Sequence, residues 1–160
     1  MTTTQYLVDD IDLRLLRALA ADPRATVVGL AEATGLARNT VHARLARLER
    51  GGVLKSFDRR IDPASLGFPL AAYILIAVTQ RKLDAIAEAL DEVPEVVEVY
   101  GLSGVTDLLV HIVARDADDL YRIAGVILDI DGVEKTTTGL VMRRMVEYRL
   151  APLLNSPPPD

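Results

Sequence analysis

The sequence predicts an α+β protein: an N-terminal helix-turn-helix bundle of the winged type, joined to a C-terminal ferredoxin-like βαββαβ domain. Up to residue 52 apolar residues recur with the helical period of about 3.6, whereas from residue 69 strand-like and helix-like runs alternate. Two short motifs repeat 37 residues apart in that second part. We therefore expect a helical domain at 1–52, a linker with a short strand at 53–68, the ferredoxin-like domain at 69–150 and a disordered tail at 151–160.

The composition narrows the class of protein. A chain of 160 residues suits one large domain or two small ones, and the lack of cysteine excludes disulfides and thiolate metal sites. The longest apolar run, 70–79, is far shorter than the roughly 20 residues of a membrane span. The polar N-terminus does not resemble a signal peptide. We expect a cytoplasmic protein with no metal, no cofactor and no contact with a membrane.

The first helix begins among acidic residues. Asp9 or Asp10 can cap it, Asp12 lies in the first turn where the helix dipole favours an anion, and Asp22-Pro23 ends it. Its buried stripe is expected to consist of Ile11, Leu15, Ala18 and Leu19.

Two further helices follow, separated by a tight turn. Thr26 is a suitable N-cap for the shorter one, and Gly35 suits its end. The next helix spans 38–50, where Val41, Leu45 and Leu48 fall at i, i+4 and i+7 and face a core. This arrangement matches the helix-turn-helix, whose second member enters the major groove of DNA. A small helical bundle with a charged surface has the same spacing, so spacing alone does not separate the two interpretations.

The outer face of the 38–50 helix carries the candidate DNA contacts. Its short amide, hydroxyl and alanines suit close approach to base edges, and the arginines around them suit phosphates. We nominate eight DNA-binding residues: Arg38, Asn39, Thr40, His42, Ala43, Arg44, Arg47 and Arg50. For His42, a base contact and a solvated surface position are both open.

The charge is divided unevenly along the chain, whose net charge is −5. Residues 1–60 carry ten basic and seven acidic side chains, and the remainder carries eight and sixteen. Within 38–60 there are seven basic and two acidic side chains. A basic front half followed by an acidic back half is typical of local phosphate binding beside a separate module that does not touch DNA.

After this helix the pattern changes twice. Val53, Leu54 and Phe57 can form a short strand, and Asp62-Pro63 with Gly67 interrupts regular structure. Strands are then expected at 70–79, 96–102, 108–114 and from 133 to about 146, with helices marked by apolar residues between 83 and 93 and between 120 and 128. Val-Pro-Glu-Val at 93–96 and Ile-Asp-Gly-Val at 130–133 occupy equivalent places after the two helices, as in a split βαβ repeat.

The first strand of this domain is apolar on both faces. Ala72, Ile74, Ile76 and Val78 form one alternating set, and the other set is equally apolar. Two helices can cover only one face of the sheet, so a second copy of the chain is the economical cover for the other. A dimer also presents two recognition helices to two half-sites.

Several groups of residues together carry a family resemblance: Asp10-Ile11-Asp12, Leu30-Ala31, Gly35-Leu36, Val41, Arg44, Leu45, Leu48, Glu49, Asp62-Pro63 and Leu66-Gly67. This combination, over roughly residues 8–150, resembles the Lrp/AsnC family, the feast/famine regulators. The resemblance implies a prokaryotic transcription regulator whose ferredoxin-like domain forms dimers and often octamers, and binds amino acids or related metabolites between dimers. Ala37 replaces the family's usual serine cap, at an expected cost of about 1 kcal/mol.

The resemblance also implies an effector site at the loop between the middle strands. Where the family commonly has Gly-Asp-aromatic-Asp, this loop reads Gly104-Val105-Thr106-Asp107, so the effector can differ or be absent. Asp107 can accept from an amino-acid ammonium, while loop N–H groups and threonines can bind its carboxylate. Asp107 can alternatively cap the turn before its strand. The expected effector-binding residues are Gly101, Leu102, Ser103, Gly104, Val105, Thr106, Asp107, Thr136, Thr137 and Thr138.

Other candidate sites have simpler explanations. His111 alternates with apolar residues, which favours core or interface packing over metal binding, and Asp116, Asp118 and Asp119 open a helix where negative charge is favoured. No set of residues suits an enzyme, because the two histidines are far apart and no Gly-rich phosphate loop is present. Two alternatives to an effector-controlled regulator are open: an architectural DNA-binding protein that ignores metabolites, and a metabolite-binding module whose helical head docks a protein.

Overall fold

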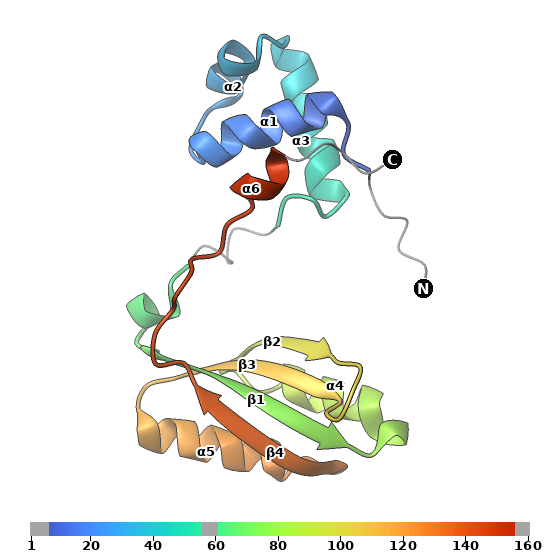
Figure 1. The fold of residues 1–160 in the computed structure, drawn as a ribbon, viewed down its shortest axis with the longest axis vertical. Helices are drawn as coiled ribbons and strands as arrows, with labels where there is room; N and C mark the ends of the chain where they lie inside the picture. The colour runs from blue at the N-terminus through green and yellow to red at the C-terminus, as the bar shows by residue number, and fades with distance from the viewer. Residues whose placement is uncertain (1–6, 56–60, 156–160) are drawn as a thin grey trace. The chain divides into compact units, whose positions relative to one another are not determined.

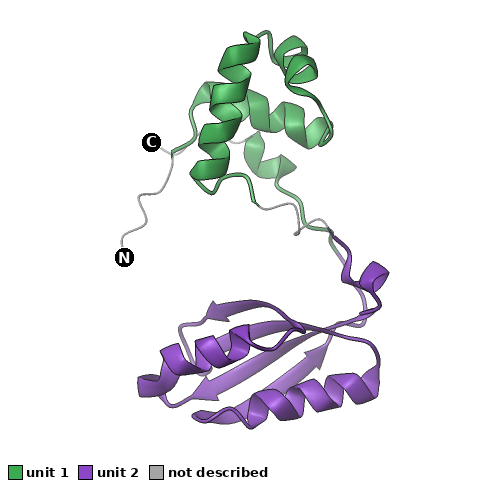
Figure 2. Ribbon diagram, turned by 180° about the vertical axis from the view of Figure 1, so that it is seen from behind, with its two compact units in different colours: residues 1–59, 146–160 green, residues 60–145 purple. Residues whose placement is uncertain are grey.

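The structure, a computed structural model, describes residues 7–55 and 61–155 (Figure 1). The chain divides into two compact units (Figure 2): residues 1–59 with 146–160, here the helical unit, and residues 60–145, here the sheet unit. Residues 146–150, which the sequence assigns to the ferredoxin-like domain, belong to the helical unit. No helix in the described part of the chain has both the length and the apolar character needed to cross a membrane.

Three helices form the core of the helical unit: α1 (Asp10–Ala21), α2 (Val27–Thr34) and α3 (Arg38–Arg50). Leu15 of α1, Leu30 of α2 and Val41 and Leu48 of α3 are fully or almost fully buried. Leu15, Val41 and Leu48 belong to the apolar stripes expected from the sequence, because helical periodicity places them on the faces that meet. The helix-turn-helix prediction is confirmed in its geometry.

The ends of α1 and α2 are capped by side chains. The Asp9 carboxylate accepts a hydrogen bond from the Asp12 N–H (2.9 Å), and the Asp12 carboxylate accepts one from the Asp9 N–H (3.3 Å). Thr26 accepts from the Gly29 N–H (3.1 Å), and Gly35 ends α2 with a φ of 67°. Such reciprocal caps satisfy donors that a helix terminus otherwise leaves without partners.

α3 ends in a turn. The first two residues of the strand expected after it, Val53 and Leu54, do not form a strand. Gly52 has a φ of 69°, and the N–H groups of Val53 and Leu54 both donate to the Leu48 carbonyl (2.9 and 3.2 Å). Because these N–H groups bond back to α3, they are not available to a sheet. Phe57, the third residue of the expected strand, lies outside the described residues.

Part of the tail that the sequence predicts to be disordered is helical. Residues Ala151–Leu154 form the short helix α6 against α1 (Figure 1), and Arg17 Nε of α1 donates to the Leu154 carbonyl (2.8 Å). Pro152 stands in the first turn of α6, where a missing N–H costs nothing. The prediction of disorder is therefore wrong for residues 151–154, and 156–160 lie outside the described residues.

The sheet unit has the ferredoxin-like plan. Its elements are a 3-10 turn (Pro63–Leu66), β1 (Leu70–Val78), α4 (Leu83–Asp91), β2 (Val96–Gly101), β3 (Leu108–Ala114), α5 (Ala117–Leu128) and β4 (Val133–Leu140). The strands are antiparallel in the order β2-β3-β1-β4, and both helices lie on one face of the sheet (Figure 1). The predicted βαββαβ order is confirmed.

β4 is shorter than expected, ending at Leu140 rather than near Val146. Its partner β1 begins at Leu70, and the Val141 N–H makes the last bond of the pair, to the Ala71 carbonyl (2.8 Å). Beyond that point β1 offers no further partner, so the ladder stops.

The two faces of the sheet differ in burial. Ala72, Ile74 and Ile76 of β1 are at most 1% exposed beneath the helices, whereas Tyr73 and Leu75 on the other face are 40% and 36% exposed. We call this second face, formed by Tyr73, Leu75 and the residues of the neighbouring strands that pair with them, the open face. The two-sided apolar pattern of β1 thus corresponds to one face covered by α4 and α5 and one face that the described residues of the sheet unit leave exposed.

Candidate DNA-binding helix and effector loop

The outer face of α3 presents most of the residues nominated for DNA contact. Ala37 precedes the helix and makes no side-chain cap, as its sequence predicts. Thr40 and Arg44 are partly buried, and the remaining nominated residues are exposed: Arg38, Asn39, His42, Ala43, Arg47 and Arg50. The helix therefore offers an amide, an imidazole and several guanidinium groups to solvent on one face, with its apolar residues directed to the core.

Arg44 is bound by two carboxylates at the start of α1. Its guanidinium donates to the Asp9 carboxylate and pairs with Asp12 (Nη1 to Oδ1, 3.2 Å), whose side chain is fully buried. The hydrogen bond from Arg44 lowers the pKa of Asp9 below its ordinary value, and the same bond raises the pKa of Arg44. Arg44 thus joins α1 to α3, which is a different role from the phosphate contact expected from the sequence.

Arg47 lies at the edge of the same cluster. Its Nη2 is 3.5 Å from Asp12 Oδ2 and 3.8 Å from Asp9 Oδ2, and its side chain is 46% exposed against 21% for Arg44. Arg47 therefore borders both the carboxylates and the solvent. The sequence did not identify Asp9 and Asp12 as partners of α3, since they lie more than 30 residues away along the chain.

A second contact fixes the turn between α2 and α3. Arg14 of α1 donates through Nη2 to the Thr34 carbonyl, and the buried Thr34 hydroxyl donates to the Leu30 carbonyl (2.5 Å). Arg14 therefore bonds a carbonyl at the end of α2 that the helix itself cannot satisfy. This residue too was missed by the sequence analysis, because its partner is set by packing rather than by local pattern.

In the expected effector loop, Asp107 is tied to β1. Its Oδ2 accepts from the Val78 N–H (2.8 Å), its Oδ1 accepts from the Gln80 side-chain amide, and its own N–H donates to the Ile76 carbonyl (2.9 Å). The Leu102 N–H closes the loop by donating to the Asp107 carbonyl (2.8 Å). The Asp107 carboxylate therefore joins the loop to the end of β1, and the loop itself is closed by the Asp107 backbone carbonyl rather than by a side-chain cap. A carboxylate has about four acceptor positions, so these bonds do not exhaust it.

The rest of the expected effector set does not converge. Gly101, Ser103, Gly104 and the fully exposed Val105 project into solvent with Leu102, and Thr106 is partly buried. Thr136 and Thr138 pair with Ile76 and Ile74 on the helix-covered face, whereas Thr137 pairs with Leu75 on the open face. β1 separates β4 from β3, which places Thr136 about 10 Å from the loop. The loop residues therefore lie together in the structure, whereas the three threonines lie on two different faces of the sheet and are separated from the loop by β1.

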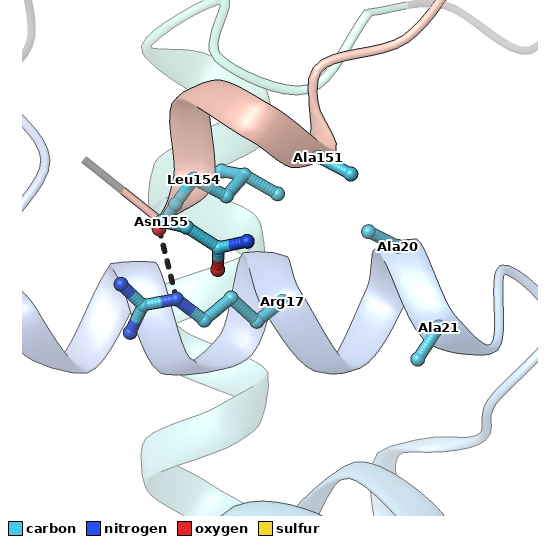
Figure 3. Close-up of a pocket in the computed structure, with 6 residues that line it drawn as sticks. All are labelled: Arg17, Ala20, Ala21, Ala151, Leu154 and Asn155. Carbon is cyan, nitrogen blue, oxygen red and sulfur yellow. Dashed lines mark hydrogen bonds between the residues drawn. The ribbon is translucent and has the colours of Figure 1, made fainter.

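The two pockets that stand out lie elsewhere. One of about 290 Å³ lies between α1 and α6 (Figure 3) and is lined by Arg17, Ala20, Ala21, Ala151, Leu154 and Asn155. The other, of about 280 Å³, lies between α4 and β2. Among the described residues, no member of the expected effector set lines either pocket.

On the open face, His111 stacks on Tyr73 with ring centroids 4.6 Å apart and 15° between the rings. Burial lowers the pKa of His111, Glu98 acts in the opposite direction and Arg144 again lowers it. Residues 7–55 and 61–155 contain no group of three or more side chains that could hold a metal ion. The stacking on Tyr73 supports the packing interpretation of His111.

Comparison with known proteins adds the following similarities. A winged helix-turn-helix DNA-binding family model matches residues 8–55, and an Lrp/AsnC ligand binding domain model matches residues 71–151. The HTH-type transcriptional regulator FL11 of Pyrococcus horikoshii is 35% identical over 146 residues, covering 91% of this chain and 97% of that protein. The HTH-type transcriptional regulator AldR of Mycolicibacterium smegmatis is 36% identical over 142 residues, covering 86% and 83%.

Solved structures give the same result. The feast or famine regulatory protein of M. tuberculosis complexed with L-methionine has a TM-score of 0.78 and 30% identity, and the match covers 89% of this chain and 97% of that one. The curated relatives are named as transcriptional regulators and not as enzymes. Fold, sequence and named relatives therefore agree on the class of protein.

Proposed function

The chain belongs to the Lrp/AsnC family of transcriptional regulators, and from that premise we propose that it binds specific DNA sequences through α3, as a dimer whose binding responds to an amino acid or related metabolite. The family membership agrees with the resemblance read from the sequence, and the helix-turn-helix makes the protein a DNA-binding regulator. Beyond family membership, we propose which residues of α3 contact the DNA bases, which face of the sheet binds a second copy of the chain, and what kind of molecule acts as the effector.

The exposed face of α3 is the observation that carries the DNA proposal. Asn39 and His42 project from the N-terminal half of the helix, where a recognition helix contacts base edges. Arg38, Arg47 and Arg50 surround them, and phosphate contacts from arginine position a protein on the duplex without reading sequence. Arg44 stabilises the position of α3 through its ion pair with Asp12 of α1. Because base contacts and phosphate contacts come from different residues, we expect substitutions at Asn39 and at Arg47 to change DNA binding in different ways.

Asn39→Ala is expected to relax sequence choice, whereas Arg47→Ala weakens binding to all DNA. A bidentate amide contact contributes about 1–3 kcal/mol of discrimination, and loss of one phosphate contact reduces the slope of log K against log salt by about 0.9. Fluorescence anisotropy with DNA from upstream of the protein's own gene and with a scrambled fragment measures both quantities. If both variants keep the wild-type affinity, preference and salt slope, α3 is not the DNA-reading element.

The same titration separates a regulator from an architectural protein. Tight, selective binding that shifts when pooled amino acids are added supports the proposal. Equal binding of both fragments with no response to the pool contradicts it and favours an architectural protein, for which Val105 and Thr106 would mark a silent effector site.

The effector proposal rests on the loop that ends at Asp107. The M. tuberculosis regulator of similar structure was solved with L-methionine. The ammonium group of a free amino acid can donate hydrogen bonds to a carboxylate such as that of Asp107. Val78 and Gln80 hold this carboxylate in one orientation. The loop then supplies exposed backbone N–H groups for the amino acid's carboxylate, with the remaining walls supplied by another dimer.

Asp107→Asn is expected to abolish the amino-acid response while leaving the fold intact. Asparagine keeps an acceptor for the Val78 N–H but loses the charge that attracts an ammonium. The measurement is the change in operator affinity on adding the pool, with a thermal melt to establish that the variant is folded. Glu134→Gln, which removes an exposed carboxylate of β4 that accepts from the Thr79 hydroxyl, is the matched control. A folded Asp107→Asn protein with the wild-type response would place the effector elsewhere.

A further inference from the structure

Two arginine contacts join α1 to the helix-turn-helix at different places. Arg44 pairs with Asp12 and so holds the middle of α3. Near the other end of α1, Arg14 donates through Nη2 to the Thr34 carbonyl, the last carbonyl of α2. The same Nη2 lies 3.9 Å from where a Cβ atom on Gly35 would stand, and Gly35 ends α2 with a φ of 67°. Arg14 therefore lies against the turn from which α3 begins.

The start of α3 depends on this turn. Ala37, its N-cap, makes no side-chain hydrogen bond, and only Gly35 and Leu36 separate it from the end of α2. Val41 is fully buried, but apolar packing is non-directional and holds the helix against the core without fixing its orientation. A hydrogen bond is directional. The direction in which α3 leaves the turn is therefore set in part by how the end of α2 is held.

We propose that Arg14 is a positioning residue for base recognition: by holding the turn before α3, it orients the end of the helix that carries Asn39 and His42. This rests on the proposed DNA-binding function of α3. Hydrogen bonds to base edges need donor–acceptor distances of about 2.7–3.2 Å, so a small shift of the helix start removes them. Arginine side chains have the rotamer freedom to keep a phosphate contact through such a shift, and that contact carries no sequence information.

Arg14→Ala is expected to lower sequence discrimination while the protein stays folded. Arg14 is exposed, so water can replace its bond to the Thr34 carbonyl. We expect the ratio of affinities for DNA from upstream of the protein's own gene and for a scrambled fragment to fall by about fivefold or more, as for the loss of one base contact. Affinity for the scrambled fragment and its salt slope should keep their wild-type values, because Arg14 binds a carbonyl of α2 and not a phosphate.

Fluorescence anisotropy of the full-length protein, at a temperature well below the melting midpoint of each variant, measures the two affinities and the salt slope. Arg17→Ala is the matched control, because Arg17 is also an exposed arginine of α1 that donates to a backbone carbonyl, but that of Leu154 in α6. An equal loss of discrimination from Arg17→Ala would show a general effect of losing positive charge on α1 and overturn the proposal. Equal weakening of both fragments by Arg14→Ala, with a smaller salt slope, would mean that Arg14 binds phosphate and is not a positioning residue.

A double-mutant cycle with Asn39→Ala tests whether Arg14 acts through the base-reading end of α3. If it does, Arg14→Ala lowers discrimination less when Asn39 is already absent, so the two losses are not additive. Full additivity of two measurable losses would contradict this mechanism. If Asn39→Ala relaxes sequence choice and Arg14→Ala changes nothing, the proposal for Arg14 fails while α3 remains the DNA-reading element. If Arg14→Ala, Asn39→Ala and Arg47→Ala all leave binding unchanged, the proposed function of α3 is itself wrong.

Discussion

Arg44→Ala is expected to lower the melting temperature of the helical unit by about 5–10 °C and to abolish DNA binding above the new midpoint. The guanidinium of Arg44 is the link between α3 and the fully buried Asp12, and it also bonds Asp9 at the start of α1. Without it, a desolvated carboxylate loses a close opposite charge, and such a loss within a buried pair is among the more destabilising single changes. Differential scanning calorimetry of the full chain measures the effect.

Arg50→Ala is the matched control for this experiment, because it removes an exposed arginine from the same helix. Arg44 lowers the pKa of Asp9, so the resulting stabilisation is fully present above the ordinary carboxyl value of 3.8 and is lost as the pH falls below it. The difference in midpoint between wild type and Arg44→Ala should therefore shrink at acidic pH. Equal midpoints for Arg44→Ala and Arg50→Ala at neutral pH would show that the link to α1 contributes nothing to stability.

The role of Arg44 illustrates how far the sequence can identify the DNA-binding surface. The bounds of α3 and its buried stripe follow from periodicity, and the expected helix 38–50 is the observed one. Arg44 lies three residues after Val41 and four before Leu48, both fully buried, so the helical wheel already places it beside the core. Its partners could not be found in the same way, because they depend on how α1 packs against α3.

In the sheet unit, too, the sequence predicts features that depend on a local pattern and misses features that depend on contacts between distant elements. β3 has the predicted bounds, 108–114, because an apolar run interrupted only by His111 defines it. The end of β4 depends on where β1 begins, and the docking of α6 on α1 depends on contacts that no local pattern records. The separation of Thr137 from Thr136 and Thr138 follows from the alternation of a strand and was predictable from the sequence.

The open face of the sheet is the surface that we propose for the second copy of the chain. Tyr73 and Leu75 lie on β1, a middle strand of the order β2-β3-β1-β4. Leu109 of β3 pairs with Leu75 on one side and with Tyr100 of β2, 45% exposed, on the other. A contiguous exposed apolar surface of this kind is the usual mark of a protein interface. A second open face is its natural complement, because a two-fold axis brings the same patch of each copy together.

Leu75→Asp is therefore expected to convert the protein to a monomer and to weaken operator binding with it. Burial of an unpaired carboxylate costs several kcal/mol, which corresponds to a rise of at least about 100-fold in the dimer dissociation constant. Val126→Asp is the matched control, because Val126 on α5 is 43% exposed, similar to the 36% of Leu75, but does not lie on the sheet. Sedimentation velocity measures the assembly state, and a thermal melt establishes that each variant is folded. A folded Leu75→Asp protein that remains dimeric would mean that the second copy binds elsewhere. If it becomes monomeric and keeps full operator affinity, one α3 is sufficient for recognition and the two half-site model is wrong.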